Sequence, residues 1–321
     1  MNLPTLPAHR LATRPHQRRW LIDQLWADEA VGIVGGEPKC CKSFLALDMA
    51  VAVASGVPCL RRFAPARTGR VLLYAAEDAL HVVRQRLAGI ATAAGRDLTE
   101  LDIHVITAPS VRLDLERDRD ALVETVVELS PALLVLDPFV RLHRIDENIS
   151  GEVAPLLAYL RELQRRFHLA VVLVHHARKG GAKMRAGQAL RGSSEFHAWG
   201  DSNLYLRRYG DQLSLSVEHR AAAAITAVPL QLAVDGEAVA LTAADPQLIA
   251  EPAPPAAAPA LAHPTTHAKI EALLAAADSP LTAAALRKLC RIRNATVTTA
   301  LGDLVAAGRV RKDAAGYAIA R

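Results

Sequence analysis

Residues 35–43 constrain this chain most, because their order is that of a phosphate-binding loop. They read Gly-Gly-Glu-Pro-Lys-Cys-Cys-Lys-Ser, close to the pattern G-x-x-x-x-G-K-[ST]. An apolar run at 30–34 precedes them, and an apolar stretch with helical periodicity follows at 44–54. The sequence therefore predicts a strand, a loop and a helix. In such a unit, backbone N–H groups at the helix N-terminus form a concave site for anions.

The loop predicts ATP and Mg²⁺ as ligands. We expect Lys42 to reach the β- and γ-phosphates, and the Ser43 hydroxyl to bind Mg²⁺. Cys41 stands where the pattern has a second glycine, a residue used where φ is unusual or the backbone must approach closely. This departure bears on the rate of hydrolysis more than on nucleotide binding. The residues expected to surround the nucleotide are Gly36, Glu37, Pro38, Lys39, Cys40, Cys41, Lys42 and Ser43.

The segments after the loop predict an α/β fold with a parallel sheet flanked by helices. Short apolar runs at 71–74, 103–106, 133–136 and 170–174 alternate with helical patterns at 80–92, 118–129 and 153–166. This alternation is typical of parallel sheets with crossover helices. Four later runs, at 202–206, 213–217, 230–234 and 239–242, are separated by turns and predict an antiparallel extension of the sheet.

Polar side chains follow three of the predicted parallel strands, where such sheets place their ligands. Asp137 comes after four apolar residues and is expected to hold Mg²⁺. Glu77 is expected to orient and activate the attacking water, with Asp78 as the alternative. One of His175 and His176 is expected to sense the γ-phosphate. A strand-end turn residue, a helix N-terminal acid and a buried, hydrogen-bonded histidine are the competing structural interpretations.

Basic segments surround this predicted core. Residues 178–187 are rich in glycine and basic residues, which indicates a loop that contacts DNA or is simply solvated. Phosphoryl transfer is often assisted by an arginine from a neighbouring subunit. The candidates for this arginine are Arg191, Arg207 and Arg208.

The composition sets broader limits. A chain of 321 residues with 51% hydrophobic residues is long enough for one large domain and a small one. Four cysteines have no paired metal-binding spacing, and the adjacent Cys40 and Cys41 do not indicate a structural disulfide. Together with the lack of an apolar signal region at the start and of a membrane-length apolar run, this favours a cytoplasmic protein without a membrane partner.

Four regions are predicted: a basic arm (1–25), an α/β P-loop ATPase domain (26–245), a Pro/Ala-rich linker (246–265) and a DNA-binding domain (266–321). Apolar residues from Trp20 to Trp26 are expected to pack on the core or to flank the nucleotide. Residues 252–259 hold too many prolines for a helix interior. Helical patterns at 269–276, 283–290 and from 294, followed by alternation around a turn, resemble a winged helix-turn-helix, with Thr282 as an N-cap.

The last region also carries an excess of positive charge. Residues 266–321 contain nine Lys and Arg against four Asp and Glu, so their excess of five equals the net charge of the whole chain, +5. A basic tail and a basic arm indicate a polyanion such as DNA as partner. Solvated surface charge, or a winged helix that docks on a protein, are the alternatives.

Taken together, residues 35–43, 75–78, 133–138, 174–179 and 191–194 resemble, in order and spacing, the RecA-like ATPases of the plasmid RepA-type hexameric helicase group. The resemblance spans about residues 20–245. It implies a RecA-like core, Mg²⁺-dependent ATP hydrolysis, a homo-oligomer such as a hexamer, and DNA as partner. By this resemblance the site residues are Lys42, Ser43, Glu77, Asp137, His175 or His176, and Arg191.

The sequence thus predicts a DNA motor, a helicase or translocase that serves replication of a plasmid or another mobile element. The alternative is a nucleotide-switched DNA-binding regulator with slow or no hydrolysis. A small-molecule P-loop kinase is a third hypothesis. The sequence argues against it, because no separate segment forms a lid for an acceptor.

Overall fold

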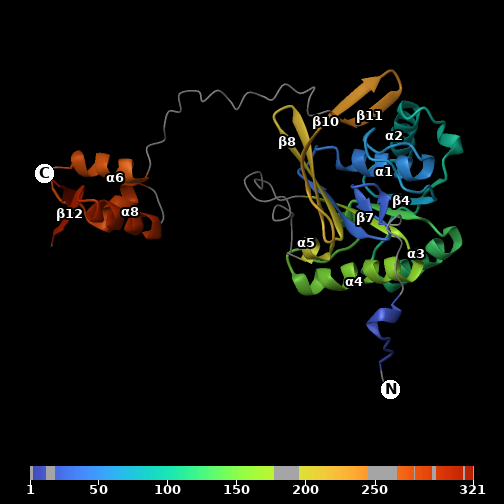
Figure 1. The fold of residues 1–321 in the computed structure, drawn as a ribbon, viewed down its shortest axis with the longest axis horizontal. Helices are drawn as coiled ribbons and strands as arrows, with labels where there is room; N and C mark the ends of the chain where they lie inside the picture. The colour runs from blue at the N-terminus through green and yellow to red at the C-terminus, as the bar shows by residue number, and fades with distance from the viewer. Residues whose placement is uncertain are drawn as a thin grey trace. The chain divides into compact units, whose positions relative to one another are not determined.

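The computed structural model describes residues 3–11, 19–176, 195–244, 266–277, 279–290, 294–313 and 315–320. The chain divides into two compact units, Met1–Ile249 and Ala250–Arg321 (Figure 1). The predicted linker at 246–265, the basic loop at 178–187 and Arg191 lie outside the described residues.

The larger unit is built on a nine-stranded sheet in the order β11-β10-β9-β8-β3-β7-β6-β4-β5. The neighbouring strands β8, β3, β7, β6, β4 and β5 are parallel to one another, and β9, β10 and β11 extend the sheet in antiparallel fashion. The predicted α/β sheet is therefore confirmed, but the run at 202–206, predicted as part of the antiparallel extension, forms β8, which is parallel to its neighbour β3. The strands are β3 (Val31–Gly36), β4 (Val71–Ala75), β5 (Ile103–Val105), β6 (Leu133–Asp137), β7 (Ala170–His176), β8 (Ser202–Tyr209), β9 (Gln212–His219), β10 (Ile225–Asp235) and β11 (Ala238–Ala243).

The sheet separates two apolar layers, because successive side chains of a strand point to opposite faces. In β6, Leu133 and Val135 join one layer, whereas Leu134 and Leu136 join the other. Helices α1 (Lys42–Ser55) and α2 (Leu80–Ala93) pack on the first layer. Helices α3 (Glu116–Leu129) and α4 (Ser150–Phe167) pack on the second (Figure 1). Burial on both faces explains why the parallel strands are continuous apolar runs.

Short elements complete the larger unit. β1 (Trp20–Ile22) and β2 (Trp26–Ala27) form a small hairpin whose Leu21 and Trp26 are fully buried, so this apolar stretch packs on the core. The others are η1 (Ala8–Arg10), η3 (Leu98–Glu100), η4 (Phe139–Arg141) and α5 (Glu195–Trp199). Among the described helices, none is both long enough and apolar enough to cross a bilayer.

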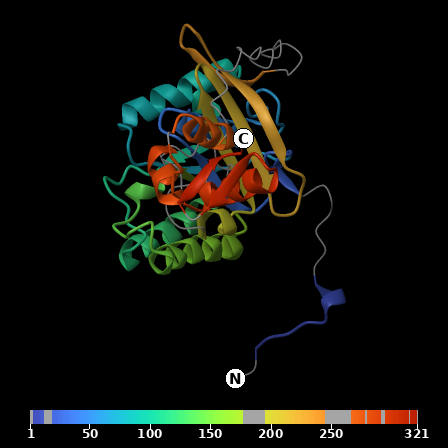
Figure 2. The same cartoon turned by 90° about the vertical axis from the view of Figure 1, so that its left-hand side faces the viewer.

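The smaller unit contains three helices and a hairpin, the elements that the sequence predicted. They are α6 (Thr266–Ala275), α7 (Ala283–Cys290), α8 (Asn294–Ala306), β12 (Val310–Asp313) and β13 (Gly316–Ile319). Figure 2 shows the two red strands beside the helices of this unit. Ile270, Leu286 and Leu301 from the three helices share one core with Val310 of the hairpin. Thr282 caps the N-terminus of α7, as the sequence predicted, because its Oγ1 accepts a hydrogen bond of 3.2 Å from the Ala285 amide.

Candidate active site

The phosphate loop connects β3 to α1 and is held by a close approach of backbones. β3 ends at Gly36, and α1 begins at Lys42. A Cβ atom on Gly36 would lie 2.4 Å from the carbonyl oxygen of Leu206 on β8 and 2.6 Å from the Sγ atom of Cys40. Only glycine fits at this position, which explains the first glycine of the sequence pattern.

Cys41 occupies the place of the second glycine and adopts the backbone conformation that a glycine would favour. Its φ and ψ are 64° and 26°, in the left-handed region, and it precedes α1 as N-cap without a side-chain hydrogen bond. Lys39 also has a positive φ, of 65°. A residue with a side chain in this region costs about 1–2 kcal/mol. Cysteine therefore preserves the turn of the loop, but at a conformational cost.

Lys42 and Ser43 are the last two residues of the loop pattern and the first two residues of α1. Lys42 is buried, and its Nζ donates a hydrogen bond of 2.8 Å to the carbonyl oxygen of Glu37. The same Nζ lies 3.9 Å from the Sγ atom of Cys40. Burial raises the pKa of the Cys40 thiol, although the nearby Lys42 opposes this. The lysine ammonium is thus folded toward the concave side of the loop, where phosphate oxygens would be bound.

Asp137 lies at the end of β6, next to the first turn of α1. Its carboxylate is buried and accepts a hydrogen bond from the Ser43 hydroxyl. Burial raises the pKa of Asp137 to about 6; the negative charges of Asp78 and Glu77 add to this, while Ser43 and Lys42 oppose it. A buried carboxylate beside a hydroxyl is the oxygen donor set that Mg²⁺ prefers. Ser43 and Asp137 therefore fit the predicted metal site.

Glu77 and Asp78 follow β4, and each is paired with a different arginine. Glu77 accepts a hydrogen bond of 3.0 Å at Oε1 from Nε of Arg141, which lies in η4. Asp78 pairs with Arg86 on α2. Both arginines were missed by the sequence analysis. No local sequence pattern identifies the pair of Glu77 and Arg141, because it joins the ends of two different strands.

One cavity of about 330 Å³ brings most of the predicted residues together. Glu77 and Asp137 face it, as do Phe44, Arg86 and Val174, which the sequence did not single out. Asp78, Gly36, Glu37 and Pro38 are not among the lining residues. The full lining is Lys39, Cys40, Cys41, Lys42, Ser43, Phe44, Glu77, Arg86, Asp137, Val174 and His176.

The structure separates the two histidines at the end of β7. His176 lines the cavity. His175 is 1% exposed and stacks on Phe196 of α5, with ring centroids 4.2 Å apart, and its ring also meets Phe139 edge-on at 6.1 Å. The alternation of side chains along a strand sends the neighbours to opposite faces of the sheet. Of the two, His176 is therefore placed to meet a bound phosphate.

Of the three candidate arginines, Arg208 lies near the loop of its own chain. β8 is the parallel neighbour of β3, and a guanidinium nitrogen of Arg208 lies 3.8 Å from the Sγ atom of Cys41. Arg207 precedes it on the strand, so its side chain starts on the opposite face.

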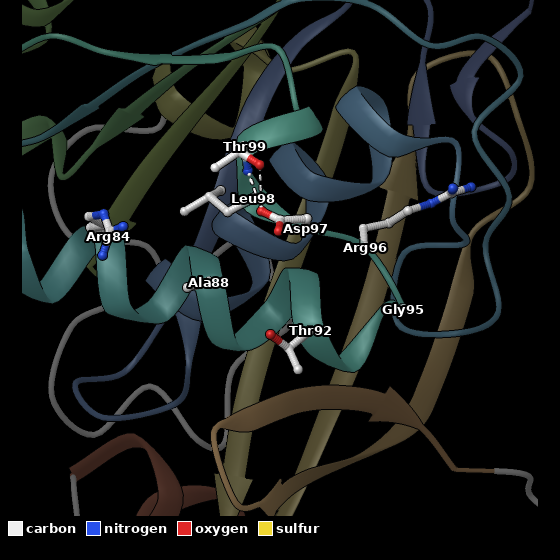
Figure 3. Close-up of a pocket in the computed structure, with 8 residues that line it drawn as sticks. All are labelled: Arg84, Ala88, Thr92, Gly95, Arg96, Asp97, Leu98 and Thr99. Carbon is white, nitrogen blue, oxygen red and sulfur yellow. Dashed lines mark hydrogen bonds between the residues drawn. The ribbon is translucent and has the colours of Figure 1, made fainter.

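A second cavity, of about 590 Å³, lies between α2 and η3 (Figure 3). The carboxylate of Asp97 already has hydrogen-bond donors there, since it accepts hydrogen bonds from the amide and the hydroxyl of Thr99 at 2.8 and 2.7 Å. Figure 3 shows that Arg96 extends away from Arg84, so the two cations do not converge. In the described part of the chain, no group of three or more His, Cys, Asp or Glu residues is suited to a metal ion. The loop at 35–43 thus remains the candidate active site.

The chain is similar to a known protein family and to solved structures. A family model described as an AAA domain matches residues 1–182, more than half of the chain. The fold is similar to that of the RadB recombinase, with a TM-score of 0.50 and 16% identity over 68% of this chain and 92% of that chain. A KaiC-like protein, PH0186 from the hyperthermophilic archaeon Pyrococcus horikoshii OT3, aligns with a TM-score of 0.47 and 12% identity over 69% of this chain and 93% of that chain. The chain therefore belongs to the AAA-domain family, as a P-loop ATPase with a RecA-like fold.

Proposed function

We propose that this protein is an ATP-hydrolysing DNA motor, a helicase or translocase of the RepA type that serves replication of a plasmid or mobile element. The observation that carries the ATPase part is the convergence of Lys42, Ser43, Asp137 and Glu77 on one cavity. Phosphoryl transfer needs few groups in fixed places, because positioning and electrostatics supply most of the catalysis. These four side chains are the groups required.

Each side chain has a separate task in the proposed mechanism. Lys42 exchanges its hydrogen bond to the Glu37 carbonyl for the β- and γ-phosphates. Ser43 and Asp137 would hold the Mg²⁺, which would neutralise charge that develops on the phosphate oxygens. A metal bound there would match the negative charge of Asp137 and offset the penalty of its burial.

Glu77 is the proposed base that orients the attacking water and accepts its proton. It lines the cavity, whereas Asp78 does not and is paired with Arg86. Glu77 is therefore the better candidate of the two. His176, which also lines the cavity, is the proposed sensor of the γ-phosphate.

A cation supplied across a subunit interface is part of the proposal, since a homo-oligomer such as a hexamer would place an arginine of one subunit near the nucleotide of the next. Arg191 stays a candidate for this task on the sequence alone. The proximity of Arg208 to Cys41 favours a role for Arg208 at the nucleotide of its own chain.

The DNA-binding part of the proposal rests on the smaller unit. Its three helices and hairpin have the element order of a winged helix-turn-helix, and Arg287, Arg311 and Lys312 are exposed there. Arg309 is instead paired with Glu271 at 2.7 Å. Exposed cations of this kind contact phosphates and position a DNA-binding helix.

A nucleotide-switched DNA-binding regulator is the second candidate, favoured by the left-handed Cys41 in the phosphate loop. ATP turnover without DNA, with single-stranded DNA and with duplex DNA distinguishes the two, with Lys42→Ala as the control. Strong stimulation by single strands supports the motor. Turnover at the level of the control in all three conditions, with nucleotide still bound, supports the regulator.

A further inference from the structure

Arg141 is a charged residue on a well-anchored segment. It ends η4, which begins two residues after Asp137. Phe139 and Leu142, on either side of it, are both fully buried. Phe139 also packs against the rings of His143 and Phe196, at centroid distances of 4.3 and 5.4 Å. The backbone that carries Arg141 is therefore held in place by the core.

Glu77 is held less firmly. It lies in the loop between β4 and α2, and its side chain is 43% exposed. Its Oε1 accepts the hydrogen bond of 3.0 Å from Nε of Arg141, whose side chain is 61% exposed. No described residue donates a hydrogen bond to the other oxygen, Oε2. One oxygen of the carboxylate is thus fixed, while the second is left to accept a proton.

The neighbouring carboxylates have other partners, so Arg141 pairs with Glu77 and not with them. Asp78 is paired with Arg86, and Asp137 is bound by Ser43 with Lys42 nearby. Each of the three carboxylates at this edge therefore has its own donor. Within the described ranges, Arg141 is the only cation paired with Glu77.

We propose that Arg141 is a positioning residue for hydrolysis, which holds the Glu77 carboxylate in the orientation that activates water. This inference rests on the proposed role of Glu77. The ion pair is exposed, and such pairs change an equilibrium by about fivefold at most. It is too weak to withhold Glu77 from the attacking water. Its loss would let the carboxylate leave the productive orientation, which lowers the rate by up to about fivefold.

The test compares Arg141→Ala, Arg141→Lys and Glu77→Gln in the full chain, together with the double variant Arg141→Ala/Glu77→Gln. Arg144→Ala is the matched control, since Arg144 lies three residues away, is exposed and has no described partner. Steady-state turnover gives kcat and KM for Mg·ATP, and single turnover with enzyme in excess measures the slow variants. Binding of a non-hydrolysable ATP analogue and the melting temperature monitor the site and the fold.

We expect Arg141→Ala to lower kcat by about threefold to fivefold with KM changed less than about twofold, and Arg141→Lys to recover part of the loss. Glu77→Gln should lower kcat by about a hundredfold or more. The double variant should be no slower than Glu77→Gln alone, because Arg141 acts through Glu77. Arg144→Ala should match the wild type.

Unchanged or faster turnover in Arg141→Ala, with Glu77→Gln inactive, would overturn the inference and leave the proposed function intact. An additional loss in the double variant would also overturn it, since Arg141 would then act independently of Glu77. Full turnover in Glu77→Gln would remove the proposed base, and the role of Arg141 with it.

Discussion

The hydroxyl of Ser43, in the first turn of α1, donates a hydrogen bond to the carboxylate of Asp137 at the end of β6. Two residues far apart in the sequence thus meet at the carboxyl edge of the sheet. The contact joins the phosphate loop to the strand that is expected to hold the metal. It also explains how a carboxylate can be buried at this position, because the hydrogen bond compensates part of the lost hydration.

Replacing Lys42 by Ala should abolish ATP hydrolysis. The side chain is buried and directed into the loop, so its removal takes away the cation that would bind the phosphates. We expect turnover to fall at least about a hundredfold, measured by phosphate release. The melting temperature serves as the control for folding. Turnover that survives in a folded variant would contradict the assignment of the loop.

Replacing Cys41 by Gly should stabilise the protein. Cys41 has a φ of 64°, and glycine adopts this conformation without the steric cost of about 1–2 kcal/mol. Part of the gain is lost because glycine makes the unfolded chain more flexible. We expect a net gain of roughly 0.5–1 kcal/mol in the free energy of unfolding, measured by urea denaturation.

Cys41→Ala is the matched control for this change. It removes the sulfur atom but keeps a Cβ in the left-handed region, so it should bring no gain in stability. If the alanine variant were as stable as the glycine variant, the backbone would not be the source of the effect.

His219 should make stability depend on pH. Burial lowers its pKa from the ordinary value of 6.5; the hydrogen bond to the Gln24 carbonyl opposes this, while Arg19 adds to it. Its Nδ1 lies 3.0 Å from the Ser202 hydroxyl, and its ring meets Trp20 edge-on. The folded state binds this proton less readily than the unfolded state does. Stability is therefore fully present above pH 6.5 and decreases as the pH falls through and below that value.

The measurement is the free energy of unfolding of the wild type and of His219→Gln between pH 5 and pH 8 (roughly the range in which a histidine titrates). Glutamine can make similar hydrogen bonds but does not titrate, so the slope below 6.5 should be smaller in the variant. Equal slopes in the two proteins would show that His219 is not responsible.

Replacing Arg311 and Lys312 by Ala should weaken DNA binding if the smaller unit contacts the duplex. Both residues are exposed on the hairpin β12–β13. Each lost phosphate contact should reduce the dependence of log K on log salt by about one unit, whatever the DNA sequence. ATP turnover without DNA should not change. Fluorescence anisotropy at several salt concentrations measures both quantities.

Arg309→Ala is the control for these two substitutions, because Arg309 is already paired with Glu271 and should contribute less to DNA binding. A salt dependence that stays the same in Arg311→Ala/Lys312→Ala would exclude the hairpin from the DNA-binding surface.

Local patterns were sufficient for much of the ATPase core. The loop at 35–43 and the strand ending at Asp137 could be predicted, because buried parallel strands and helix starts have strong sequence signals. The antiparallel extension was predicted too, but β8, which was counted with it, is parallel to β3. The pairing of Glu77 with Arg141 could not be predicted. It joins two loops that follow neighbouring strands β4 and β6, and this adjacency exists only once the strand order is known.

The choice between His175 and His176 also required the tertiary structure. Both follow the same apolar run, and the position of β7 between β3 and β6 decides which face meets the phosphate loop. Cys41 is a further case, since its residue type argues against the left-handed conformation that it adopts in the loop. The order of residues establishes which residue types are available for phosphate and metal chemistry. Only the packing of the sheet decided which of them meet, because contacts between distant residues depend on strand order and register rather than on local pattern.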